Sequence, residues 1–131
     1  MTGLSLKFVT LAALSLVVGV GLGIFMGITH DFQLVPVHAH INLVGWASLA
    51  LFGVVYHLMP RMGERRIASI HFLLAAPSAN LLPIGIAMSI LGHSPTLAIV
   101  ASLLWFVGAI LFLVQLLGIL FAVPPAPVPA E

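Results

Sequence analysis

The chain has 131 residues, of which only seven are Lys, Arg, Asp or Glu, a charged share of 5% beside a hydrophobic share of 62%. A soluble globular protein carries about a quarter charged residues, so this chain could not cover a water-facing surface. The composition excludes a soluble enzyme, a nucleic-acid-binding protein and a disordered chain, and it indicates an integral membrane protein. The net charge of +1 is too small to indicate an anionic partner.

The positions of the charges predict the spans. They leave three uncharged apolar runs, at residues 8–30, 32–60 and 67–130, and the last run is long enough for two spans. About 20 apolar residues cross the hydrocarbon layer as a helix. The sequence therefore predicts an all-α membrane protein with four transmembrane helices in one domain (1–123), at about 5–28, 37–59, 67–92 and 96–122. A Pro-rich tail, 124–131, is expected to be extended.

The basic residues predict the topology. Arg61, Arg65 and Arg66 lie in the short connection between the second and third predicted helices. The positive-inside rule makes this connection cytoplasmic, and both termini are then cytoplasmic too, in a bacterial-type inner membrane. The first helix has a long apolar stretch and no A-x-A-like cleavage site after it. We interpret it as a retained span and not as a cleaved signal peptide.

Small and polar residues within the spans indicate how the helices pack. Ser15, Gly19, Gly23 and Gly27 form a stripe with a spacing of four. Such a stripe lets another backbone approach closely, either in an oligomer or in the fourth helix of the same chain. In the third helix, Asn80 lies between Pro77 and Pro83, and we expect its side chain to bond a carbonyl that a proline leaves free. We expect Gln115 to form an interhelical hydrogen bond.

The chain has six histidines and no cysteine, so it can form no thiolate metal site and no covalent haem c. Two histidines enter the second predicted helix in the segment His38-Ala39-His40-Ile41-Asn42-Leu43-Val44-Gly45. Ionisable groups at membrane depth usually mark a functional site, and neutral imidazole is a common metal ligand. Successive residues of a helix differ by about 100°, so His38 and His40 lie about 200° apart, on nearly opposite faces. This geometry suits two cofactors, one on each side of the helix. Asn42 and Gly45 share the face of His38, and Gly45 could leave room for a flat macrocycle.

Another interpretation makes the histidines ordinary residues of the membrane interface. His38 and His40 follow closely after Pro36, so both could lie in the headgroup zone. His57 and His71 flank the basic connection, where snorkelling side chains are expected. His30, beside Asp31, is expected in a loop, and His93 lies in a predicted turn and could have either role. The spacing alone leaves these interpretations open.

The segment from His38 to Gly45, with Leu51-Phe52-Gly53 further on, resembles the tenth helix of the haem–copper oxidase superfamily. The catalytic subunit of nitric oxide reductase is the most similar branch. In that family one histidine of a His-x-His pair ligates the low-spin haem and the other ligates the high-spin haem. The resemblance implies that His38 and His40 are haem axial ligands and that Asn42 and Gly45 lie in the haem pocket.

The resemblance also implies an assembly. The family's catalytic subunit contains three pseudo-symmetric arcs of four helices, and the motif lies on the second helix of its arc, as it does here. One chain would then be one four-helix arc, and three copies would form a homotrimer. His38 of one copy would face His40 of the next and hold a bis-histidine haem b at each boundary.

Further sites follow from the same resemblance. The family places metal-binding histidines at the outer end of the third helix of an arc, which implies a copper-type ligand at His93. The family also pairs the haem propionates with arginines, which this chain carries on the predicted inner side. His57 and His71 are therefore the second choice of haem ligands. The only tyrosine, Tyr56, lies at the opposite end of its helix from the family's redox tyrosine.

These observations predict a small cytochrome b, with an oxidoreductase relationship but without an evident full catalytic site. Two strong axial ligands favour electron transfer, while a displaceable ligand would permit binding of a diatomic gas. A lipid quinol could donate the electrons. No predicted span contains Asp or Glu, which disfavours proton pumping. The alternative is a haem-free channel or transporter, or an accessory subunit of a respiratory complex.

Overall fold

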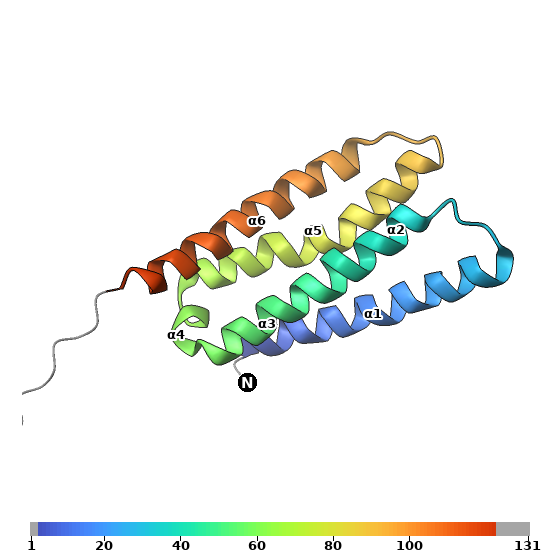
Figure 1. Cartoon of the computed structure of the whole chain (residues 1–131). Coiled ribbons are helices and arrows are strands. Elements are labelled where there is room, and N and C mark those ends of the chain that lie inside the picture. Colours follow the sequence, from blue (N-terminus) through green and yellow to red (C-terminus); the bar gives the residue numbers. More distant parts are fainter. Residues whose placement is uncertain (1–2, 123–131) are drawn as a thin grey trace, which may run out of the picture.

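The computed structural model describes residues 3–122, and these form an antiparallel bundle of helices (Figure 1). Four of its helical stretches are long and apolar enough to cross a membrane: α1 (Gly3–Thr29), a second span (Val35–Leu58), α5 (Arg66–Ile90) and α6 (Thr96–Leu120). The single turn α4 (Pro60–Gly63) lies in the connection between the second span and α5. The protein is therefore a multi-pass membrane protein with four transmembrane helices.

The predicted spans are confirmed, because no predicted end differs from the observed one by more than two residues. The first residue of α1, the turn α4 and the last residue of α6 lie at the same end of the bundle (Figure 1). We refer to it below as the α4 end. The predicted Pro-rich tail at 124–131 lies outside the described residues.

The second span changes its winding along its length. It begins as an α-helix, α2 (Val35–His40), continues as a π-helix, η1 (Ile41–Ser48), and ends as an α-helix, α3 (Leu49–Leu58). Pro36 lies in the first turn, where a missing N–H costs nothing. Within η1 the hydroxyl of Ser48 donates to the carbonyl of Leu43, five residues earlier (2.8 Å). π-helical turns are rare and often occur at functional sites. This one follows directly after the two histidines of α2.

An aromatic cluster joins all four spans near the α4 end. Its ring centroids are 4.5–5.9 Å apart. The cluster consists of Phe8, Phe52, Tyr56, His71, Phe72, Trp105 and Phe112. Phe8 and Tyr56 are fully buried, so this end of the bundle is the best-packed part of the described chain.

α5 contains both prolines of the third span, Pro77 and Pro83. The side chain of Asn80, which lies between them, does not form the hydrogen bond that we expected. The Nδ2 of Asn80 donates to the carbonyl of Ala76 (2.7 Å). Since a helical N–H pairs with the carbonyl four residues earlier, Pro77 and Pro83 leave free the carbonyls of Leu73 and Ala79. The prediction that Asn80 bonds a freed carbonyl was therefore wrong.

Replacing Gly85 by alanine is expected to destabilise the bundle by about 1–2 kcal/mol, as overpacking typically does. Gly85 lies directly against the backbone of α6 at Leu97 and Ala98, so a methyl group would enter only if α6 moved. Gly21→Ala is the matched control, because a Cβ there meets nothing within 4 Å. Since alanine favours a helix by about 1 kcal/mol over glycine, Gly21→Ala should be neutral or stabilising. Unfolding in a titration with SDS measures the free energy of unfolding of both variants. Equal changes in the two variants would contradict the close contact at Gly85.

Candidate functional site

His38 and His40 lie in the last turn of α2, directly before η1, and both are partly buried. The Nδ1 of His38 lies 2.9 Å from the carbonyl oxygen of Gly19 in α1. The Nδ1 of His40 lies 2.7 Å from the carbonyl oxygen of Pro36, one turn earlier in its own helix. The two rings therefore have separate partners, and neither shares a contact with the other.

These contacts assign the proton on each ring. A carbonyl oxygen can only accept, so each Nδ1 carries the hydrogen and donates it. A neutral imidazole then keeps its lone pair on Nε2. Histidines that ligate metals usually have their other ring nitrogen held in this way by a carbonyl or carboxylate, which fixes the tautomer and the ring orientation. Among the described residues, the Nε2 of His40 has no hydrogen-bond partner.

Asn42 lies one turn after His38, and its side chain contacts both the backbone and the ring of His38. Its Nδ2 donates to the carbonyl of His38 (2.8 Å) and lies 3.4 and 3.5 Å from the two nitrogens of the ring. An atom placed along the lone pair of Nε2 would be much closer to Nε2 than to Nδ1. The amide therefore does not occupy that lone pair, and the sequence prediction that Asn42 belongs beside His38 agrees with this contact.

The small residues of α1 accept the second span in antiparallel order. A Cβ built on Gly23 would lie 2.8 Å from the ring of His38, and one on Gly19 would lie 2.7 Å from the side chain of Asn42. Any side chain at these two glycines would displace the residue opposite. The partner of the stripe within the chain is thus the second span. Of the two alternatives that the sequence left open, packing against the fourth helix was wrong, and packing in an oligomer stays a prediction.

Gly45 also faces this stripe. A Cβ built on it would lie 2.9 Å from the Cβ of Ser15, and Gly45 is buried. The space that we expected beside Gly45 for a macrocycle is therefore filled by α1. A flat cofactor held by His38 would have to lie elsewhere on the surface of the helix.

The remaining histidines lie apart from this pair. His30 and His93 lie in turns and are exposed, and the backbone of His30 has a positive φ of 55°. His57 is exposed near the end of α3. Within residues 3–122, no group of three or more His, Cys, Asp or Glu side chains could hold a metal ion. The copper-type role predicted for His93 thus receives no ligand set from the described residues.

His71 is not the snorkelling residue that the sequence suggested, because its side chain is completely buried. It lies among the aromatic rings, and its Nδ1 is 2.8 Å from the hydroxyl of Tyr56. His57 is exposed, so these two second-choice haem ligands do not converge on one site. The expectation of an interfacial position failed for His71 because its side chain faces α1 and α3, where the rings of Phe8 and Phe52 pack against it.

Gln115 extends this contact into α6. Its Nε2 donates to the hydroxyl oxygen of Tyr56 (2.9 Å), so the hydrogen of Tyr56 is available for the Nδ1 of His71. The predicted interhelical hydrogen bond of Gln115 is confirmed. Sequence analysis missed the cluster of three because its members lie 15 and 59 residues apart and no local spacing connects them.

No protein-family model, curated protein or solved structure matches this chain. The chemistry therefore depends on the site itself. Each of the two imidazoles donates from Nδ1 to a carbonyl, which leaves Nε2 as the nitrogen that could ligate a metal. Within the described residues, however, no second imidazole lies opposite either of them, so a haem with two histidine ligands needs one from another molecule.

Proposed function

We propose that the protein is a small cytochrome b, an integral membrane protein whose His38 and His40 are haem axial ligands. The observation that carries the proposal is that both imidazoles have their Nδ1 held by a backbone carbonyl, at 2.9 and 2.7 Å. This arrangement leaves Nε2 as the ligating nitrogen of each ring. The π-helix that starts at the next residue supports it, since such turns concentrate at functional sites.

The second axial ligand comes from another copy of the chain. In each chain the ring of His38 contacts α1, and the ring of His40 contacts only its own helix. The two rings thus lie on different sides of the helix, so His38 of one copy can ligate the same haem as His40 of its neighbour. Such a head-to-tail interface is heterologous, and it generates a closed ring when the rotation between neighbouring copies closes. A trimer is favoured because the resemblance to the haem–copper oxidase superfamily makes each chain one of three four-helix arcs.

Electron transfer is the activity that this site supports best. Haem b supplies one-electron redox chemistry, and two histidine ligands leave no open position for a gas unless one ligand is displaced. The carbonyls of Gly19 and Pro36 hold the ring protons and raise the basicity of Nε2. Asp31 and Glu64 lie in connections between spans. Without a carboxylate in the spans, proton pumping has no acidic pathway.

The positive-inside rule supports a location in a bacterial-type cytoplasmic membrane with both termini inside. Arg61, Arg65 and Arg66 lie at the α4 end of the bundle, the same end as the first residue of α1 and the last residue of α6 (Figure 1). His38 and His40 are then near the outer side. Haem reduction would be driven by an electron donor that reaches this side or enters from the bilayer.

Absorbance spectra test the proposal. The chain is expressed with added haem precursor, purified in mild detergent, and measured oxidised and after reduction with dithionite. We expect the Soret and α bands of low-spin haem b, one haem per chain, and the mass of a trimer. A missing Soret band would overturn the proposal and favour the haem-free channel, transporter or accessory subunit. A monomeric mass with haem retained would contradict ligation across subunits.

A further inference from the structure

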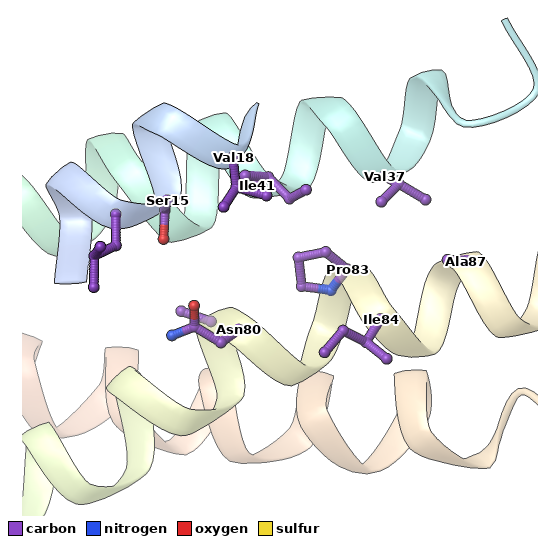
Figure 2. Close-up of a pocket in the computed structure, with 10 residues that line it drawn as sticks. Ser15, Val18, Val37, Ile41, Asn80, Pro83, Ile84 and Ala87 are labelled. Carbon is purple, nitrogen blue, oxygen red and sulfur yellow. The ribbon is translucent and has the colours of Figure 1, made fainter. Parts of the chain in front are cut away.

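A cavity of about 350 Å³ lies between α1, the second span and α5 (Figure 2). Its walls are apolar except for two residues, Ser15 of α1 and Asn80 of α5. Ser15 is the 13th residue of α1, which has 27 residues, and Asn80 is the 15th of α5, which has 25. Both therefore lie near the middle of their spans, at the depth of the hydrocarbon core.

The cavity opens sideways toward the lipid. Leu14 and Val18 from α1 and Ile84 from α5 line it, and they are 58%, 58% and 51% exposed. Closer to the α4 end, α1 and α5 contact each other through Phe8 and Phe72, whose ring centroids are 4.9 Å apart. A molecule dissolved in the bilayer can thus enter between α1 and α5 without passing through the headgroup region.

Ser15 directs its hydroxyl into this cavity. Its side chain is 5% exposed, and among the described residues its hydroxyl has no hydrogen-bond partner. Two serines of other spans bond the carbonyl four residues earlier, Ser78 with Leu74 and Ser102 with Ala98. Figure 2 shows the oxygen of Ser15 directed across the cavity toward α5.

Asn80 supplies the opposite polar group. Its Nδ2 donates to the carbonyl of Ala76, which leaves Oδ1 without a hydrogen-bond partner in residues 3–122. Figure 2 shows this oxygen directed back toward α1. Unpaired polar groups in a hydrocarbon environment are unfavourable, so an occupant that bonds to both is strongly favoured.

We propose that this cavity binds the ring of a lipid-soluble quinone or quinol. The ring of such a molecule is uncharged and carries oxygens on opposite sides, so one oxygen can bond to the hydroxyl of Ser15. A quinol hydroxyl at the other side can donate to the Oδ1 of Asn80. The isoprenoid tail leaves through the lateral opening. The volume lies within the range of small-molecule pockets, roughly 300–1,000 Å³.

A phospholipid would not satisfy the same groups. Its charged headgroup stays at the interface, so only an acyl chain would reach the cavity and both polar side chains would remain unpaired. The quinone proposal stands on the cavity alone and does not require haem binding by His38 and His40. If both proposals hold, the quinol is the electron donor that a cytochrome b of this kind needs.

Photolabelling tests the proposal on the full chain in lipid nanodiscs. The probe is a short-tail ubiquinone with an azido group on its ring, and the competitor is unlabelled short-tail ubiquinone. We expect saturable labelling of the peptides that contain Ser15 and Asn80. Ser15→Ala should weaken binding of the ubiquinone about tenfold, the loss of one well-formed hydrogen bond. Asn80→Leu should weaken competition by the corresponding short-tail ubiquinol about tenfold, because the Oδ1 of Asn80 can only accept a hydrogen bond and only the quinol has a hydroxyl to donate.

A matched pair of variants tests whether the label enters this cavity. Val18→Phe should block the mouth and abolish saturable labelling. Val17→Phe, at a neighbouring residue that is 71% exposed and does not line the cavity, should leave labelling unchanged. Equal labelling in both variants, or no saturable labelling of the wild-type chain, would overturn the proposal.

Equal competition by a fatty acid, with no effect of Asn80→Leu, would instead assign the cavity to an acyl chain. The Soret band of the same samples reports haem separately.

Discussion

Replacing His38 by alanine is expected to yield a protein without haem absorbance, and replacing His40 is expected to give the same result. If each haem is held by His38 of one copy and His40 of the next, every haem in the ring depends on both residues. Each single variant therefore removes a ligand from all interfaces. Haem content, measured as pyridine haemochrome per chain, checks this. If each variant retained about half of the haem, the two residues would serve separate haems.

Mixing the two variants gives a sharper test of ligation across subunits. When His38→Ala and His40→Ala chains are expressed together, an interface keeps both ligands only where an intact His38 meets an intact His40 of its neighbour. Random assembly predicts about one such interface in four for a heterologous ring. Haem absorbance should then return to that fraction of the wild-type value. No recovery in mixed oligomers would contradict shared ligation.

Two controls separate ligand loss from misfolding. His93→Ala changes an exposed turn residue and should retain full haem content. Far-UV circular dichroism and elution volume should match between His38→Ala and the wild type, because His38 contributes one hydrogen bond to α1 and does not belong to the aromatic cluster. Low-spin haem spectra in both His38→Ala and His40→Ala would remove the ligand assignment.

The spans could be predicted well because charge is confined to their ends. Lys7, Asp31 and the group from Arg61 to Arg66 lie outside the hydrocarbon core or at its edges, and the apolar runs between them have the length of a membrane crossing. This rule needs no knowledge of which helix contacts which. It predicts the number and length of the helices and says nothing about their faces.

The helix neighbours could not be predicted by the same means. In a soluble protein an apolar stripe identifies the buried face, but lipid and protein interior are both apolar, so a membrane helix gives no such signal. For this reason the sequence left two partners open for the stripe of α1, an oligomer or the fourth helix, and did not identify the second span. A usable signal existed in the spacing of Gly19 and Gly23, which matches Asn42 and His38 in reverse order.

The change from α-helix to π-helix within the second span also could not be predicted from the sequence. An α-helix and a π-helix can have the same composition, and the π-helical segment Ile41–Ser48 packs against α1 at Gly45. The π-helix adds to the local width of the helix and shifts the faces that follow it. Tyr56, further along the same span, lies inside the bundle, where His71 and Gln115 contact it. Such a three-way contact is a tertiary property that no local pattern carries.

Replacing Tyr56 by phenylalanine is expected to destabilise the protein by about 2–4 kcal/mol, because it orphans two buried polar groups that each cost about 1–3 kcal/mol. The hydroxyl of Tyr56 accepts from Gln115 and donates to His71, and no other group replaces either contact at comparable distance. The Nε2 of His71 and the Oε1 of Gln115 already lack partners within the described chain. The cluster therefore has little capacity to rearrange.

A double-mutant cycle shows whether the cost comes from this contact. His71→Phe keeps an aromatic ring among Phe8, Phe52 and Phe112, and the double variant with Tyr56→Phe removes both ends of one hydrogen bond. Because contacting residues couple, we expect the double variant to be about 1–2 kcal/mol more stable than the sum of the single effects predicts. His57→Phe, at an exposed histidine of the same span as Tyr56, should change stability by less than about 0.5 kcal/mol. Unfolding in SDS, followed by tryptophan fluorescence, measures the wild type and all four variants. Hydrogen bonds between membrane helices contribute about 0.6 kcal/mol on average in double-mutant cycles. If each single substitution cost no more than this and the two costs simply added, the orphaned groups would have found other partners.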